Sequence, residues 1–527
     1  MPCTDKYICD NANTIYYSGE VGKGMKLKAQ PYDIEVGRYE VILNAVDAEE
    51  IGIRAGDRVL VKNKDTITAV VETTDAIINT GRVGVYREAW EAMKLVPDEV
   101  VELLPAARPK SVSFIRKKMD NLKLTNEEMH AIIEDIVDGN LTEVELTAFV
   151  TASYIYHMDA DEIEWMTRAM VKTGDQISFD THPIMDHHSI GGVPGNKISL
   201  DIVPIVAAAG LLIPKTSSRA ITGAGGSADL MEILCPVSFR ADEIKKMTTQ
   251  VGGCLVWGGA TNIAPADDKI ISVEYPLSID PKSQLLASVM AKKFAVGADT
   301  MVLDIPTGSE TKIPSVAEGR KLAREFMEIG DRLGMKVECA LSYGGSPVGR
   351  SIGGGLEVRE AMLLLEKNEG PRSLLEKTAS IAGMMLEMGG VAARGEGGKM
   401  ANELIRSGKA LKKFKEIIEV QGGDPDVTSE DVPVGDKVAT VLSPQDGYIR
   451  EVSNKRLVAA CRLAGAPHDK GAGILLHKKK GEYVNKGDGL FTIYADKEWK
   501  LDTAIKESLR EPIMYVEGMI LEKIQVV

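Results

Sequence analysis

The stretch "DHHSIGGVPGNKISLD" (residues 186–201) joins a strand-like segment to a helix-like segment through a glycine-rich turn. "THPIMD" (181–186) precedes it, and "NKISLDIVPIVAAAG" (196–210) continues it as an apolar, helix-like run that ends before Gly210. Such a turn leaves free backbone N–H groups at the positive end of a helix, where an anion is stabilised. The stretch therefore predicts a strand–turn–helix unit with an anion site, although short glycine motifs are also typical of plain turns.

The adjacent residues His187 and His188 raise the alternative of a metal site. Neighbouring side chains on a strand point to opposite faces, so they rarely share a metal ion. The helical spacing H-E-x-x-H is absent, and the other five histidines form no ligand cluster. The turn matches neither a Walker A loop nor G-x-G-x-x-G. We predict no metal, and an anion site of another kind.

The composition excludes several classes of protein. The chain has 527 residues, 44% hydrophobic and 27% charged, with a net charge of −14, which argues against nucleic acid as the main partner. No run of about 18 apolar residues predicts a membrane span. The first residues lack the basic start and apolar core of a signal peptide. The six cysteines are scattered without C-x-x-C spacing, which favours the reducing cytoplasm over a disulfide framework.

Periodicity predicts a multidomain chain of mixed α/β and α+β class. "RYEVILNAV" (38–46), "DRVLVKN" (57–63) and "TITAVVETT" (66–74) alternate like strands of a small β-barrel or sandwich. Capping boxes at Thr125–Glu128, Thr142–Glu145 and Asp159–Glu162 begin three helices. The predicted parts are an extension (1–24), a β-rich N-terminal domain (25–105), a helical subdomain (112–178 with 265–296), an α/β phosphate-binding domain (179–264 with 297–430) and a C-terminal α+β domain (438–527).

Two further segments carry candidate site residues. "KTSSRAITGAGGSADLMEIL" (215–234) places hydroxyls, an arginine and glycines just before a helix, as a phosphate or ribose site requires. In "YPLSIDPKSQLLASVMAKKFAVGAD" (275–299), Ser288 and Lys292 share one helix face, and Asp280 precedes that helix. The alternative interpretation of this helix is an exposed amphipathic surface, which fits Lys293 best.

In this order the segments resemble the thymidine phosphorylase (nucleoside phosphorylase type II) family. The resemblance rests on "HHSIGG", "SSRAITGAGGSADLME" and the Ser-x-x-x-Lys helix, with further matches in "PVGRSIGGGLEVREAM", "IEVQGGDP" and "GILLHKKKGEYVNKGD". It covers about residues 110–500. Residues 25–105 and "GGVPGNK" look like the archaeal-type AMP phosphorylases within it. The resemblance implies a pentosyltransferase that converts a nucleoside 5′-monophosphate and phosphate into base and ribose 1,5-bisphosphate.

The departures from the family pattern carry information. The pyrimidine enzymes have an arginine seven residues before the position of Asp280, where this chain has Val273. A site that lacks a required polar partner loses that substrate heavily. Lys312 has no expected counterpart in those enzymes and suits an extra 5′-phosphate. His187 replaces a lysine; a neutral histidine weakens the anion site, and a protonated one makes it pH-sensitive.

The resemblance also implies roles for individual residues. Asp280 is our own candidate, from the chemistry, for the proton donor to the departing base. The substrate contacts implied are Gly192, Ser218, Arg219, Ala220, Ile221, Thr222, Gly223, Ser227, Ser288 and Lys312. The positions implied for inorganic phosphate are His187, His188, Ser189, Ser199, Ser217 and Lys292, with Ser227 matching a phosphate position as well.

The expected chemistry is phosphorolysis of an N-glycosidic bond, with positive charge building on the sugar and bound phosphate as nucleophile. Asp280 needs burial to hold a proton near neutral pH. No cofactor is required, and a homo-oligomer that pairs through the helical subdomain is expected. Two alternatives stay open. One is a pyrimidine nucleoside phosphorylase, against which Val273 and Lys312 speak. The other is a catalytically decayed nucleotide-binding protein, against which Asp280 speaks.

Overall fold

The computed structural model describes residues 7–9, 15–17, 24–220 and 223–520. The chain forms two compact units, Met1–Ala152 and Ser153–Val527, and the boundary falls within helix α5 (Glu143–Tyr156). Within residues 1–24, strands β1 (Tyr7–Cys9) and β2 (Ile15–Tyr17) pair antiparallel.

None of the helices in the described ranges has the length and apolar character needed to cross a membrane.

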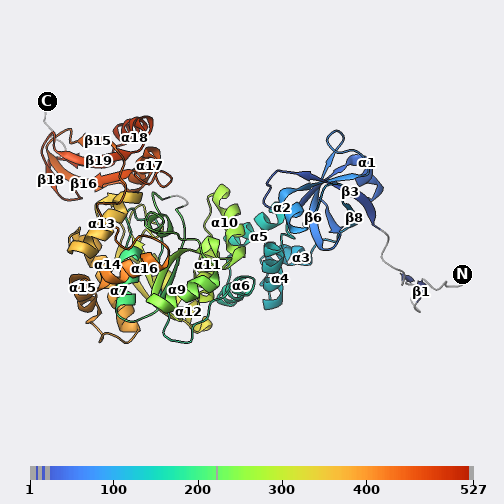
Figure 1. Cartoon of the computed structure of the whole chain (residues 1–527), viewed down its shortest axis with the longest axis horizontal. Coiled ribbons are helices and arrows are strands. Elements are labelled where there is room, and N and C mark those ends of the chain that lie inside the picture. Colours follow the sequence, from blue (N-terminus) through green and yellow to red (C-terminus); the bar gives the residue numbers. More distant parts are fainter. Residues whose placement is uncertain (1–6, 10–14, 18–23, 221–222, 521–527) are drawn as a thin grey trace, which may run out of the picture. The chain divides into compact units, whose positions relative to one another are not determined.

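The first unit contains a closed six-stranded barrel, blue in Figure 1, so the barrel alternative is confirmed over the sandwich. Closure pairs every strand edge, which removes exposed edges. The segment "RYEVILNAV" is strand only through Asn44, whose Oδ1 accepts a hydrogen bond of 3.0 Å from Val46 N and caps helix α1 (Ala45–Glu50). Helix α2 (Arg87–Ala92) follows β7. In barrel order the strands are β3 (Met25–Tyr32), β7 (Arg82–Tyr86), β4 (Glu40–Asn44), β6 (Thr66–Thr74), β5 (Arg58–Lys62) and β8 (Val100–Pro105).

The predicted capping boxes are confirmed. Glu128 N donates to Thr125 Oγ1 at 3.3 Å while Thr125 N donates to Glu128 Oε2 at 2.8 Å, and Thr142–Glu145 and Asp159–Glu162 repeat the device. In the second unit, α6 packs against α11. The segments of these two helices, 112–178 and 265–296, were predicted from the sequence to form one helical subdomain. These helices are α3 (Ser111–Met119), α4 (Asn126–Val137), α6 (Ala160–Lys172), α10 (Pro265–Leu277) and α11 (Lys282–Ala295).

Parallel strands form the centre of the second unit (Figure 1). One sheet has the order β13-β12-β9, and β10 pairs with β11 in a second. All of β12 is buried, as expected for a parallel strand covered on both faces. The strand predicted at "THPIMD" is displaced, because it begins at Met185 and continues through both histidines. The strands are β9 (Met185–Ser189), β10 (Ile213–Ser217), β11 (Gly253–Trp257), β12 (Thr300–Thr307) and β13 (Lys336–Tyr343).

Helices surround these strands, and most of these helices share one large apolar cluster with the strands. Helix α7 contributes an almost fully buried face, because its sequence "SLDIVPIVAA" is apolar nearly all round. The helices are α7 (Ser199–Ala208), α8 (Ser227–Met231), α9 (Ala241–Val251), α12 (Val316–Leu333), α13 (Gly354–Lys367), α14 (Arg372–Met388), α15 (Gly397–Arg406) and α16 (Lys409–Val420).

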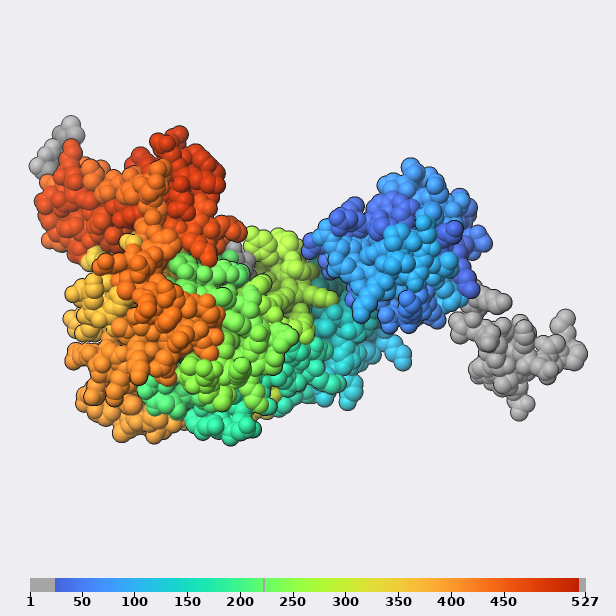
Figure 2. Space-filling view, viewed as in Figure 1, coloured from blue at the N-terminus to red at the C-terminus, as the bar shows by residue number. Residues whose placement is uncertain are grey.

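The C-terminal segment is an α+β layer of antiparallel strands and two helices, as predicted. Figure 2 shows its red surface directly against the green and orange surface of the central segment. Two residues from the central segment, Ala224 and Ile352, belong to its apolar core. Strand β14 (Ser351–Ile352) of the central segment pairs with β17 and extends one of its sheets. The elements of the C-terminal segment are β15 (Lys437–Leu442), β16 (Gly447–Val452), β17 (Gly473–Leu476), β18 (Tyr483–Val484), β19 (Gly489–Ala495), β20 (Met514–Glu517), α17 (Asn454–Ala464) and α18 (Glu498–Arg510).

Candidate active site

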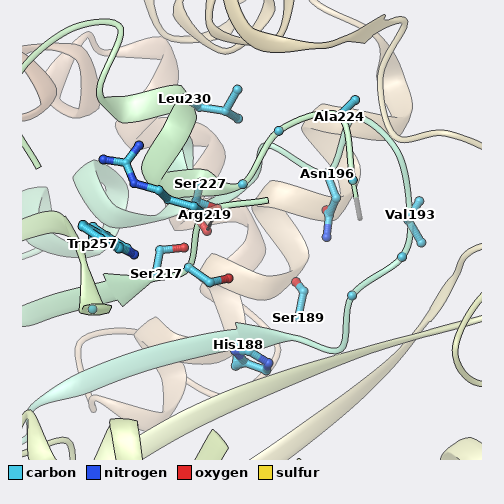
Figure 3. Close-up of a pocket in the computed structure, with 18 of the residues that line it drawn as sticks. His188, Ser189, Val193, Asn196, Ser217, Arg219, Ala224, Ser227, Leu230 and Trp257 are labelled. Atoms are coloured by element: carbon cyan, nitrogen blue, oxygen red, sulfur yellow. Dashed lines mark hydrogen bonds between the residues drawn. The ribbon is translucent and has the colours of Figure 1, made fainter. Parts of the chain in front are cut away.

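A cavity of about 750 Å³ lies where β9 and β10 end. Ser189 and Ser217 are the last residues of these strands, and the turn after each contributes to the wall. Carboxyl ends of parallel strands are where α/β folds bind ligands. Figure 3 shows Ser189, Ser217 and Ser227, from three separate segments, around the same space. The predicted residues that line it are Gly192, Ser218, Arg219, Gly223, Ser227, Ser288, His188, Ser189, Ser199, Ser217 and Lys292.

The serine hydroxyls of the cavity wall belong to two hydrogen-bonded groups. Ser189 Oγ donates to Asp304 Oδ2 at 2.8 Å, and Ser227 Oγ donates to Ser199 Oγ at 3.2 Å. Ser199 Oγ is in turn 3.0 Å from His187 Nε2. Each hydroxyl has a single proton, and Ser189 and Ser227 already donate theirs within the protein. These hydroxyls can bind a tetrahedral anion only by turning their protons from Asp304 and Ser199 towards it.

Both histidines are neutral near pH 7. Burial, followed by the charges of Lys215 and Lys293, lowers the pKa of His187 well below its usual value. Burial and the same lysines lower the pKa of His188 in the same way. The His188 side chain reaches the cavity wall, whereas His187 lies behind Ser199 and is not among the lining residues. The structure therefore favours a neutral His187, which contributes no charge to the anion site, over a protonated His187 that would make the site pH-sensitive.

Positive charge comes from Lys292 and also from two lysines that the sequence did not assign to the site. Lys215 and Lys293 line the cavity, and their ammonium groups lie 3.5 and 2.9 Å from oxygens of the buried Asp186. Burial lowers the pKa of Lys215 to about 7, although Asp186 opposes this shift. The interpretation of Lys293 as an exposed surface residue is wrong, because its side chain is only 3% exposed. The position of Asp186, immediately before the histidine pair, was the feature of the sequence that could have indicated these buried lysines.

Helix α11 presents Ser288 and Lys292 to the cavity, as their spacing predicted. The Lys292 ammonium lies 2.5 Å from Asp267 Oδ2, and Asp267 is buried on α10. Burial lowers the pKa of Lys292, but the charge and hydrogen bond of Asp267 outweigh it and raise the pKa above the ordinary value. Lys292 is therefore a fixed cation at the wall.

The glycine-rich loop after β10 is only partly available to a ligand. Arg219 lines the cavity, but its guanidinium donates two bonds of 2.7 Å to Glu232 and lies 4.6 Å from the Trp257 ring centre. Ala220 does not line the cavity; its backbone N donates to Asp229 Oδ2 at 2.7 Å. The predicted residues Ile221 and Thr222 lie outside the described residues.

Asp280 and Lys312 are not among the residues that line the cavity, and they form an ion pair with each other. Lys312 Nζ is 2.5 Å from Asp280 Oδ2, and the two side chains are 47% and 45% exposed. The burial that the sequence argument required of Asp280 is therefore absent. Lys312 does lie beside Gly192, because a Cβ added to Gly192 would be 3.8 Å from Lys312 N. Gly192 has a φ of +102°, which favours glycine.

The described site combines hydroxyls, neutral imidazole and buried ammonium groups around one enclosed space. Such donors bind phosphate oxygens and sugar hydroxyls. Val273, in place of the arginine of the pyrimidine enzymes, is buried on α10 and offers no polar group to a base. The arrangement therefore suits a sugar carrying anionic groups.

Comparisons with known proteins agree with this arrangement. Family models match in series: a glycosyl transferase family helical bundle domain over residues 112–174, a glycosyl transferase family a/b domain over 181–411, and a pyrimidine nucleoside phosphorylase C-terminal domain over 448–513. These matches define the class as a glycosyl transferase of the phosphorylase type.

Individual relatives narrow the class. An AMP phosphorylase of Methanocella arvoryzae is 85% identical over 95% of this chain and 100% of its own length. One from Methanococcoides burtonii is 62% identical over 95% of this chain and 99% of its own length. The solved anthranilate phosphoribosyltransferase of Thermus thermophilus has a TM-score of 0.49 and 20% identity over 58% of this chain and 98% of that chain. This chain belongs to the same family as the two AMP phosphorylases.

Proposed function

We propose that this chain is an AMP phosphorylase, a pentosyltransferase that converts AMP and phosphate into adenine and ribose 1,5-bisphosphate in nucleotide salvage or AMP catabolism. The observation that carries the proposal is the 85% identity to an AMP phosphorylase across the whole length of that relative. The backbone of Lys312 lies beside the cavity-lining Gly192, and this supports a nucleotide over a nucleoside, since a lysine side chain that starts there can turn its ammonium to a 5′-phosphate.

The mechanism follows from the positions of the charges. Inorganic phosphate binds among Ser189, Ser217 and the Lys215 ammonium, which lower the cost of bringing an anion into the cavity. The C1′–N bond breaks as positive charge builds on the ribose, and a phosphate oxygen forms the new bond to C1′. The electron pair of the broken bond leaves on the base, which takes a proton from Asp280. No step requires a metal or an organic cofactor.

The ion pair between Lys312 and Asp280 gives substrate binding a second effect. An ion-paired Asp280 is a carboxylate and has no proton to donate. A 5′-phosphate that binds Lys312 replaces Asp280 as its partner, and the freed carboxylate then takes a proton from solvent before it donates that proton to the base. Movement of Asp280 into a drier position over the base then completes the site, in the manner of closure steps in other enzymes.

The two alternative functions are less well supported. A pyrimidine nucleoside phosphorylase lacks support because the buried Val273 offers no hydrogen bond to a pyrimidine ring. A decayed nucleotide-binding protein is disfavoured because Asp280 is retained and the hydroxyl network at Ser189 and Ser199 is intact.

The test is incubation of the protein with phosphate and AMP, CMP, UMP, adenosine or thymidine, followed by chromatographic measurement of free base. We expect phosphate-dependent release of adenine from AMP and little or none from adenosine. The same assay measures the base preference among the three nucleotides. Equal turnover of thymidine and AMP would contradict the assignment.

Two further proposals concern the protein in the cell. We expect a homo-oligomer built on a dimer, because α5 and α10 expose the large apolar side chains Ile155, Tyr156 and Tyr275. Light scattering that gives a monomer near 57.0 kDa at micromolar concentration would contradict this. We also expect a cytoplasmic enzyme, which the scattered cysteines favour.

A further inference from the structure

The C-terminal segment supplies part of the cavity wall. Asn454, Lys455 and Val458, in the first turns of α17, line the same space as Ser189 and Gly192. The sequence patterns and the family resemblance assign no substrate contact to this helix. Its side chains nevertheless face the ligand space of a site whose other lining residues all precede residue 358 in the sequence.

The loop that carries Lys312 is tied to this turn through Glu310. Ser453 Oγ donates to Glu310 Oε1 at 2.9 Å, and Lys455 N donates to Glu310 Oε2 at 3.3 Å. Asn454 Nδ2 adds a bond of 2.9 Å to Gly344 O, beside the same loop. The backbone of Lys455 is therefore bonded to Glu310, and Glu310 lies two positions before Lys312 in the sequence.

The charge on Lys455 is not paired with a carboxylate. Its side chain is exposed, lines the cavity, and makes no ion pair within the described part of the chain. Both oxygens of Glu310, the nearest bonded carboxylate, already accept hydrogen bonds from Ser453 and from the Lys455 backbone. Lys312, by contrast, is held by Asp280. An anion that enters this end of the cavity can therefore bind Lys455 without displacing a carboxylate.

We propose that Lys455 binds the 5′-phosphate of the nucleotide substrate together with Lys312, so that the C-terminal segment takes part in selecting nucleotides over nucleosides. The inference rests on the proposed function, since it assumes that the substrate carries a 5′-phosphate. Inorganic phosphate is assigned to the other end of the site, where Lys215, Ser189 and Ser217 lie. The dianion bound between two lysines can leave Asp280 unpaired, which links Lys455 to the proton donor through the substrate.

The test compares Lys455→Ala with the wild-type enzyme in steady-state assays of AMP phosphorolysis. A hydrogen bond to a charged group predicts that the KM for AMP rises about tenfold or more. The kcat and the KM for inorganic phosphate should change little, and Lys455→Arg should restore most of the affinity for AMP. Calorimetric titration should find weaker binding of AMP and unchanged binding of adenosine.

Lys480→Ala is the matched control, because Lys480 is an exposed lysine of the same C-terminal segment that does not line the cavity. Should Lys455→Ala fold poorly, Lys455→Gln removes the charge and keeps a long polar side chain. A KM for AMP equal to that of Lys480→Ala, or an equal rise in the KM for phosphate, overturns the proposal. Failure of the wild type to release adenine from AMP would instead overturn the proposed function.

Discussion

The charged residues in and beside the cavity are held in different ways at the end proposed for inorganic phosphate and at the end proposed for the nucleotide. At the phosphate end, Asp186, Lys215 and Lys293 have side chains no more than 4% exposed. At the nucleotide end, Asp280 and Lys312 have side chains nearly half exposed. Buried ionic groups are costly unless they are well paired, whereas exposed pairs contribute about 0–1 kcal/mol and exchange partners readily. The charged groups at the phosphate end are thus fixed in place when the protein folds. Those at the nucleotide end take their final partners only when the substrate binds.

The strongest test of this contrast is the carboxyl group at the nucleotide end. Asp280→Asn keeps the size of the side chain but cannot donate a carboxyl proton. General acid catalysis is typically worth about 10²–10⁴-fold, so we expect kcat to fall by that factor while the KM for phosphate stays nearly constant. Steady-state kinetics at several pH values provide the measurement. Near-normal kcat throughout would remove Asp280 as the acid.

The phosphate end should respond through stability. Asp186→Asn leaves the buried ammonium groups of Lys215 and Lys293 without their counterion. Breaking a buried ion pair from one side costs about 3–5 kcal/mol, which we expect to lose from the free energy of unfolding. Denaturant melts measure it, with the exposed Asp502→Asn as the control. A change below about 1 kcal/mol, the range of exposed pairs, would erase the contrast.

Lys312→Ala should weaken ground-state binding of AMP more than the chemical step. The loss of one charge-assisted contact to the 5′-phosphate predicts a rise in the KM for AMP of about tenfold to a hundredfold. The free energy of unfolding should change by less than about 1 kcal/mol, because the pair with Asp280 is exposed. Kinetics and melts on the same preparation test both parts. A large loss of stability with an unchanged KM would assign Lys312 a structural role.

The smallest expected effect is a pH dependence confined to the phosphate end. The pKa of Lys215 is lowered to about 7, so this group loses its proton as the pH rises through neutrality. Phosphate favours the protonated form, and its KM should therefore rise above pH 7, by at most about tenfold per unit. Lys215→Met should remove this part of the dependence, which separates it from the titration of phosphate itself. The KM for AMP should not follow the same curve.

The sequence predicted what local patterns encode. The structure confirms three features that depend on neighbours within a few residues. They are the capping boxes such as Thr125–Glu128, the strand "TITAVVETT", and the position of Ser288 and Lys292 on one helix face. Burial depends on long-range neighbours: Lys293 follows Lys292 directly, yet it meets Asp186 from β9 and is enclosed. The wall formed by α17 gave no local signal, because its contact with the loop of Glu310 joins residues more than 140 positions apart.

Ala224 belongs both to the glycine-rich loop at the cavity and to the apolar core of the C-terminal segment. Local unfolding of that segment therefore removes a packing partner of the loop and dissolves part of the cavity wall. A ligand that binds only the intact cavity stabilises every region whose opening would destroy its site. A ligand bound at the cavity therefore makes local unfolding of the C-terminal segment less favourable. This holds although that segment is distant in sequence from the turn at residues 186–201.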